Sequence, residues 1–335
     1  MYFNQYNLLE KEEIAKQLKN YSLADCLKDY SKLNDGVANG VDTIAPLSLV
    51  GVKFVEHYTY TELLNTKTKQ GISFYDFWYN KGFYMDRDNS TRKLIEYIKT
   101  ENPKLNEIKQ AKKVFNIYYG SVDVFRPTTA ARLYEKYHPT CVLDFTMGWG
   151  GRLVGACVSN VPKYIGIDYN DNLSIPYQKM QSQLKSLSNT ESLLMFTDCL
   201  TVDYDKLSYD MVFTSPPYYN KEIYGGKTTH KTEEEWNTMF YTPILKKTWN
   251  GLAQGGHFCL NIPAILYDKV CLPLFGPATE TMEMKKFSRT LPTNRETQRK
   301  NVGQKYKEHI YVWKKINDTT DTDKNNDEEN NLKIS

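Results

Sequence analysis

Several features that define special protein classes are missing from this chain of 335 residues. No apolar run approaches about 18 residues, the length of a membrane-spanning helix, so no transmembrane segment is expected. The N-terminus has no basic start followed by an apolar stretch, so no secretory signal is expected. The six cysteines are far apart and form no Cys-x-x-Cys pair, which predicts reduced core residues rather than a zinc site or disulfide framework. We therefore expect a cytosolic or nuclear protein that binds no metal.

Charge is unevenly distributed along the chain, although the formal net charge is only +3. Residues 317–335 hold six acids and two lysines with almost no apolar side chains, which predicts a disordered acidic tail. Residues 285–315 hold ten lysines or arginines against two glutamates. A charge run of this kind is either a solvated face or a surface for a polyanion such as nucleic acid.

The chain divides into two regions of different texture. Residues 1–115 are rich in Tyr, Lys and Asn, and their apolar spacing predicts a mainly helical accessory region, with helices near 8–20 and 91–99. Residues 116–316 alternate short apolar runs with helical segments. This alternation is typical of an α/β domain with a mostly parallel, doubly wound sheet covered on both faces, in which ligands bind beyond the carboxyl ends of the strands.

A glycine turn follows the first predicted strand of this domain. The segment CVLDFTMGWGGR places Asp144 at the strand end and Gly148 and Gly150 in the turn before a helix. Glycine there allows positive φ and a close approach to a ligand. The segment is neither the dinucleotide pattern nor a P-loop, because the glycine spacing differs and no Lys-Ser/Thr follows. Asp144 suits an ammonium group better than a phosphate.

Two further acids end neighbouring predicted strands. Asp168 follows the second strand, where an acid accepts hydrogen bonds from ribose hydroxyls, and Asp198 follows the third, where it could accept from an adenine amine. Each Asp alone could be a helix cap or turn residue. Together with the glycine turn, the three acids favour a cationic ligand that carries adenosine.

The fourth predicted strand ends in SPPYY (215–219). Two prolines fix the backbone and leave carbonyls without local N–H competitors. The oxygen of Ser215 and the carbonyl of Pro216 could take the hydrogens of an exocyclic amine while the ring of Tyr218 stacks on the base. Pro-Pro followed by an aromatic residue also occurs in ordinary turns.

Taken together, these segments resemble the S-adenosylmethionine-dependent amino-methyltransferases of DNA, which modify adenine N6 or cytosine N4. The pattern Asp-x-x-x-Gly-x-Gly is followed about seventy residues later by SPPY, the serine form of that family's Pro-Pro-aromatic signature. FRPTTAARLYEKY (125–137) resembles the motif that covers the methionine end of the cofactor. The resemblance spans about 120–315 and implies a Rossmann-like methyltransferase fold with a C-terminal antiparallel strand. Trp149 is bulkier than the residue common in the glycine turn.

The resemblance assigns roles to two sets of residues. Asp144 would hold the methionyl amine, Asp168 the ribose and Asp198 the adenine, while Thr128 and the 126–129 backbone would meet the methionine carboxylate. The residues implied to bind S-adenosyl-L-methionine are Arg126, Thr128, Asp144, Phe145, Gly148, Gly150, Asp168 and Asp198. The residues implied to form the catalytic acceptor site are Ser215, Pro216, Pro217 and Tyr218.

The implied reaction is direct methyl transfer to the amine of a base flipped out of double-stranded DNA. No Pro-Cys pair is present, so the thiolate chemistry of cytosine C5 methyltransferases is not expected. DNA recognition would fall to 1–115 or to 263–308, in which Arg295, Arg299 and Lys300 are the expected nucleic-acid contacts. The abundance of Asn, Lys, Tyr and Ile indicates an A+T-rich genome, such as that of a virus or parasite.

Two other functions remain open from the sequence. A methyltransferase of RNA or of a protein glutamine amide could use the same Pro-Pro-aromatic site, because any planar amide or amine fits it. A non-catalytic partner could also retain the fold, although the presence of Asp144, Asp168, Ser215 and Tyr218 argues against it. The choice between adenine and cytosine is open as well.

Overall fold

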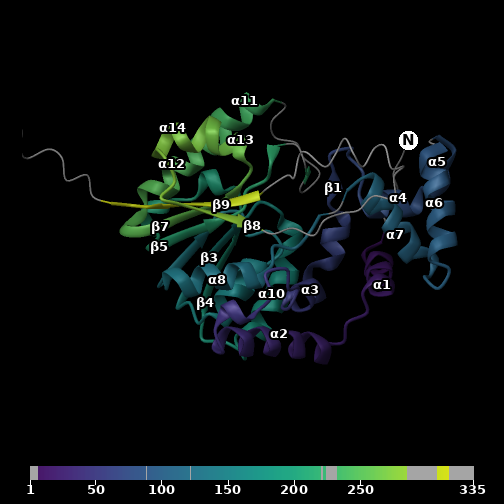
Figure 1. Cartoon of the computed structure of the whole chain (residues 1–335), viewed down its shortest axis with the longest axis horizontal. Helices are drawn as coiled ribbons and strands as arrows, with labels where there is room; N and C mark the ends of the chain where they lie inside the picture. The colour runs from purple at the N-terminus through teal and green to yellow at the C-terminus, as the bar shows by residue number, and fades with distance from the viewer. Residues whose placement is uncertain are drawn as a thin grey trace, which may run out of the picture.

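The computed structural model describes residues 7–316 apart from 88, 121, 220–221, 224–231 and 285–307. Its centre is a seven-stranded sheet in the order β4-β3-β2-β5-β7-β9-β8 (Figure 1). The strands are β2 (Cys141–Asp144), β3 (Lys163–Asp168), β4 (Glu191–Phe196), β5 (Tyr209–Thr214), β7 (Leu252–Ile262), β8 (Glu280–Met284) and β9 (Glu308–Lys314).

The sheet has the topology of the Rossmann-like methyltransferase fold. The first five strands of the sheet order pair in parallel, and β9 runs antiparallel between β7 and β8. The strand order reverses between β2 and β5, so a topological switch point lies at their carboxyl ends. The predicted α/β fold and its C-terminal antiparallel strand are therefore confirmed.

Helices cover both faces of the sheet and enclose two apolar cores (Figure 1). One face carries α8 (Pro127–Tyr137), α9 (Gly151–Val158) and α10 (Ser174–Leu184). The opposite face carries α11 (Glu233–Trp236), the π-helical turn Asn237–Tyr241, α12 (Thr242–Asn250), α13 (Ala264–Leu266), the π-helical turn Tyr267–Cys271 and α14 (Leu272–Phe275). Strands β2 and β5, in the middle of the sheet, are almost fully buried between these layers, which explains their apolar sequences, whereas β4 and β8 are partly exposed.

The N-terminal region is helical, as predicted, and it packs directly on the α8–α10 layer. Its helices are α1 (Leu8–Leu18), α2 (Leu23–Ala38), α3 (Val52–Asn65), α4 (Phe74–Tyr79), α5 (Lys81–Arg87), α6 (Asn89–Glu101) and α7 (Glu107–Tyr118). One contiguous core joins Phe54 of α3 with Val154 of α9 and Tyr177 of α10. Helix α7 runs across the predicted boundary at residue 115, and the division into 1–115 and 116–316 stays a prediction.

Two very short strands connect the N-terminal region to the second half of the chain. Strand β1 (Lys67–Thr68) follows α3, and it pairs antiparallel with β6 (Glu222–Ile223), which follows the SPPYY segment. A two-residue strand has no detectable period, so this pair could not be predicted from the sequence.

Three further predictions concern the cysteines, membrane-spanning helices and the C-terminal tail. The six cysteines are all buried and free, as predicted. No helix in the described part of the chain is both long and apolar enough to cross a membrane. The predicted tail, 317–335, lies outside the described residues.

Candidate functional site

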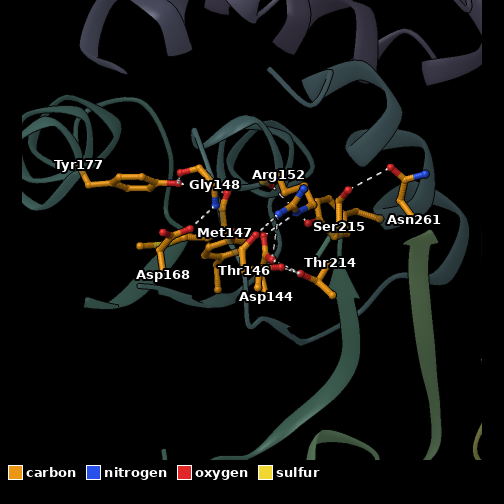
Figure 2. A network of polar contacts seen from close by, with 12 residues as sticks. Asp144, Thr146, Met147, Gly148, Arg152, Asp168, Tyr177, Thr214, Ser215 and Asn261 are labelled. Atoms are coloured by element: carbon orange, nitrogen blue, oxygen red, sulfur yellow. Dashed lines mark hydrogen bonds and ion pairs between the residues drawn. The ribbon is translucent and has the colours of Figure 1, made fainter. Parts of the chain in front are cut away.

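The glycine turn and the SPPYY segment lie side by side at the switch point. The turn follows β2 and SPPYY follows β5, and these strands are neighbours in the sheet. Thr146 and Thr214 join the two segments through their hydroxyl oxygens, which are 2.6 Å apart (Figure 2). Two motifs separated by about seventy residues in the sequence therefore form one site.

Asp144 is the centre of a buried polar network below the turn (Figure 2). Its carboxylate accepts from Arg152 Nε at 2.6 Å and from Arg152 Nη2 at 3.1 Å. It also accepts from the hydroxyls of Tyr164 at 2.6 Å and Thr214 at 2.8 Å. Asp144 has no exposed surface, and Arg152 is only 3% exposed. The network ties β2, β3, β5 and α9 together.

These contacts correct the role predicted for Asp144. A carboxylate that is fully buried and holds an arginine and two hydroxyls presents no oxygen to a methionyl amine. Burial acts to lower the pKa of Arg152, but the charge and the hydrogen bonds of Asp144, together with smaller effects of Tyr164 and Tyr134, raise that pKa above the ordinary value. Arg152 also donates to the Thr146 carbonyl, so the ion pair braces the backbone that enters the glycine turn. Asp144 is a structural support for the site.

Phe145 departs from its predicted role in a similar way. Its side chain is 1% exposed and belongs to the apolar core on the α11–α14 face of the sheet. Trp149, the bulky residue of the turn, is 6% exposed and packs in the opposite core. The turn accommodates the indole because the ring points into the core. The bulky side chain therefore does not cover the outer surface of the turn.

Gly148 and Gly150 both have positive φ, 58° and 100°, but their surroundings differ. A Cβ on Gly148 would meet only the Thr146 carbonyl oxygen, at 4.0 Å, and would point into open space. A Cβ on Gly150 would lie 2.7 Å from Met180 Cε, inside the core. Gly148 therefore borders open space, while a side chain at Gly150 would have to displace the end of Met180 and would adopt a strained φ.

This difference predicts different effects for the two valine variants. Gly148→Val should block cofactor binding and leave the protein folded, apart from the strain of a side chain at positive φ. Gly150→Val should lower the melting temperature, because the new side chain overlaps Met180. Calorimetry with S-adenosylmethionine and thermal unfolding of both variants measure the two effects. Wild-type affinity in folded Gly148→Val would place the ligand elsewhere.

Asp168 is held at the edge of the turn by two backbone donors. Gly148 N donates to Oδ2 at 2.8 Å, and Asn170 N donates to Oδ1 at 2.9 Å. Burial raises the pKa of the Asp168 carboxyl to about 6 against the effect of these two donors, and the charge of Asp144 adds to the rise. Each oxygen retains acceptor capacity for a further donor. Asp168 is thus a partly desolvated acceptor beside the open face of Gly148.

Asp198, the third predicted acid, follows β4 and caps the short 3₁₀ turn Cys199–Thr201. Its Oδ1 accepts from Leu200 N at 2.9 Å. Helix-capping was the alternative interpretation for each acid, and Asp198 performs it. Its contact with an adenine amine stays a prediction.

Arg126 and Thr128 stand at the start of α8, where their side chains turn toward the N-terminal region. Arg126 Nη1 donates to the Pro46 carbonyl at 2.9 Å, and Thr128 Oγ1 donates to the Ser48 carbonyl at 3.4 Å. Thr128 has no exposed surface. Their side chains join the two regions of the chain, and the predicted contacts of Arg126, Thr128 and the 126–129 backbone with the cofactor stay predictions.

The SPPYY segment is fixed by residues from β7 and from the opposite helical layer. Asn261 of β7 is 2% exposed, and its Oδ1 accepts from Ser215 Oγ at 3.1 Å (Figure 2). The same oxygen accepts from Tyr218 Oη at 3.0 Å. Ser215 donates its only proton in this bond, so its lone pairs remain available as acceptors. The site thus holds the serine in an acceptor orientation.

Tyr241 braces the same segment from below. Its hydroxyl donates to the Pro217 carbonyl and accepts from Tyr219 N at 3.0 Å. Tyr219 has a positive φ of 53°, a conformation that is uncommon for a non-glycine residue. Among the described residues, none donates to the Pro216 carbonyl.

Sequence reasoning missed four residues of this site: Arg152, Tyr164, Tyr241 and Asn261. Arg152 follows the glycine turn in a predicted helix, and an arginine in that apolar segment could have indicated a buried ion pair. The others are ordinary core or strand residues whose partners are far away in the sequence. The predicted DNA contacts Arg295, Arg299 and Lys300 lie outside the described residues. Within the described part of the chain, no group of acids, histidines or cysteines could hold a metal ion.

Comparison with known proteins finds only a weak likeness to solved structures. The sequence matches no family model and no curated protein. Among solved structures, TrmN from Thermus thermophilus matches 63% of this chain and 67% of its own, with 14% identity and a TM-score of 0.38. A SAM-dependent O-methyltransferase from Thermotoga maritima matches 61% of this chain and 71% of its own, with 13% identity and a TM-score of 0.38. The M. jannaschii tRNA m1G37 methyltransferase matches 59% of this chain and 53% of its own, with 15% identity and a TM-score of 0.37. TM-scores this low say nothing about the ligand or the activity of this chain, so both are argued from the residues of the site.

Proposed function

We propose that this chain is a methyltransferase that moves a methyl group from S-adenosyl-L-methionine to the exocyclic amine of a base in double-stranded DNA, at adenine N6 or cytosine N4. The observation that carries the proposal is the junction of the glycine turn with the SPPYY segment through Thr146 and Thr214. A cofactor site and an amine-acceptor site that share a border can bring donor and acceptor atoms together.

The residues at the turn fit such a cofactor. Gly148 leaves a space that a Cβ would fill, and Asp168 offers carboxylate oxygens beside it for ribose hydroxyls. Asp198 and the 126–129 backbone would complete the site at the adenine and carboxylate ends. When bound, S-adenosylmethionine supplies a methyl group already activated by a positively charged sulfur, so no covalent enzyme intermediate is needed.

The acceptor side has the groups to orient an amine. Ser215 Oγ and the Pro216 carbonyl would accept the two amine hydrogens, which directs the nitrogen lone pair toward the methyl donor. The ring of Tyr218 would stack on the flipped base, a contact worth about 1–3 kcal/mol per base. Asn261 keeps Ser215 and Tyr218 in place for these roles.

Double-stranded DNA is the acceptor that we test first, because the basic run 285–315 favours a polyanion. Wild-type protein is given S-adenosylmethionine with a labelled methyl group together with duplex DNA, RNA and a glutamine-containing protein. We expect label in the duplex, and none with the Gly148→Val variant. If the label is found only in RNA or only in protein, the proposal of a DNA acceptor is wrong and the labelled molecule is the acceptor.

The raised pKa of Asp168 predicts a pH dependence of cofactor binding. A charged carboxylate accepts stronger hydrogen bonds from ribose hydroxyls than a protonated carboxyl group does. Binding of the cofactor therefore favours the charged form of Asp168. The pKa of Asp168 in the cofactor-free protein is about 6. The affinity for S-adenosylmethionine should therefore be constant above pH 7 and fall as the pH drops through 6. Calorimetric titrations from pH 5 to pH 8 measure this. Asp168→Asn should bind weakly at every pH, and an unchanged pH profile in that variant would contradict the assignment.

A further inference from the structure

Helix α3 of the N-terminal region ends beside the loop that follows β3. Glu62, near the end of the helix, accepts through Oε1 from Asn170 Nδ2 at 3.1 Å and from Asn172 Nδ2 at 3.2 Å. Its other oxygen accepts from Asn65 Nδ2 at 3.3 Å. The carboxylate is therefore held from its own helix and in turn holds two amides of the opposite region.

Asn170 connects Glu62 to Asp168, the acid at the end of β3. It is 2% exposed, and its backbone N–H donates to Asp168 Oδ1 at 2.9 Å. Its side-chain oxygen accepts from Asn172 N at 3.3 Å, which closes the turn. A chain of hydrogen bonds thus runs from Glu62 through Asn170 to Asp168 and on to the amide of Gly148.

The same part of the N-terminal region also reaches the acceptor side. Five residues beyond Glu62, β1 begins and pairs Lys67 with Ile223 and Thr68 with Glu222. Strand β6 comes shortly after SPPYY, so residues 62–68 contact the loops on both sides of the switch point. The N-terminal region therefore directly contacts the segments that follow β3 and β5.

We propose that Glu62 is a positioning residue that fixes the ribose-binding loop, residues 168–172, through Asn170. This inference rests on the proposed function for its link to the cofactor. It gives the N-terminal helices a part in cofactor binding that is separate from any part in DNA recognition.

Three variants test the proposal in the full-length protein. Glu62→Ala removes the acceptor, Glu62→Gln keeps one side-chain oxygen for the two asparagines, and Glu13→Ala removes an exposed acid on α1 as a matched control. Loss of both bonds in the alanine variant should weaken S-adenosylmethionine binding about tenfold and raise its KM by the same factor. The KM for DNA should not change. The glutamine variant should recover to within about threefold of wild type, and the control should equal wild type.

Hydrogen–deuterium exchange of the peptide 168–173, measured without cofactor, separates this proposal from the proposed function. Faster exchange in Glu62→Ala, with wild-type rates in Glu62→Gln and Glu13→Ala, supports positioning even if wild-type protein binds no S-adenosylmethionine, in which case the proposed function fails. Unchanged exchange in Glu62→Ala overturns the positioning role. Equal loss of affinity in the alanine and glutamine variants also overturns it, because charge alone would then explain the effect.

Discussion

Replacing Asp144 with alanine should lower the free energy of unfolding by about 3–5 kcal/mol, because the change leaves the buried Arg152 without its counter-ion. The variant also removes the acceptor for the hydroxyls of Tyr164 and Thr214, both of which are fully buried. Denaturant unfolding followed by circular dichroism measures the loss. Replacing Arg152 with methionine in the same chain removes the unpaired charge and should restore part of the stability.

A surface ion pair of the same residue types provides the control. Asp42 and Arg132 approach to 3.9 Å, and the Asp42 side chain is 98% exposed. Asp42→Ala should therefore change the unfolding free energy by less than about 1 kcal/mol. If Asp144→Ala is as stable as Asp42→Ala and yet has lost S-adenosylmethionine binding, Asp144 contacts the cofactor directly and the structural role is wrong.

Ser215→Ala should reduce turnover about 100-fold, with little change in the melting temperature or in the affinity for S-adenosylmethionine. The lost oxygen is an acceptor for the target amine, and this hydrogen bond matters most as the nitrogen becomes nucleophilic. Single-turnover methylation of DNA separates this step from binding. Ser182→Ala, which changes an exposed serine of α10, should have wild-type kinetics.

Variants of Tyr218 distinguish its ring from its hydroxyl. Tyr218→Phe loses the hydrogen bonds to Asn261 but keeps the ring, so much of the activity should remain. Tyr218→Ala loses the stacking face and should raise the KM for DNA. Full methylation by Tyr218→Ala, combined with none by Asp168→Ala, would leave a methyltransferase whose acceptor pocket is not SPPYY.

The strands and the sheet edge at which the candidate residues lie could be predicted from the sequence because their signals are local. Apolar runs separated by helical segments define β2, β3, β4, β5 and β7, and polar residues at their carboxyl ends define the ligand edge. The acids at 168 and 198 and the glycine turn at 148 occupy that edge as expected. The fold class and the place of these residues at the edge of the sheet therefore follow from patterns within about ten residues.

The internal supports of the site could not be predicted, because they depend on contacts between distant parts of the chain. Ser215 and Asn261 are 46 residues apart, and Glu62 and Asn170 are 108 apart. The role of Asp144 was predicted wrongly for the same reason. A strand-end acid that binds a ligand and one that binds a buried arginine have the same local sequence, and only the folded structure distinguishes them.

The position of the transferred methyl group tests the central claim most directly. Duplex DNA is incubated with the protein and S-adenosylmethionine carrying a deuterated methyl group, then digested to nucleosides and analysed by tandem mass spectrometry. We predict label on adenine N6 or cytosine N4 with wild-type protein and its near disappearance with Ser215→Ala. Label on a ring carbon or on a ribose oxygen, or equal labelling by Ser215→Ala, would contradict amine methylation at the SPPYY site.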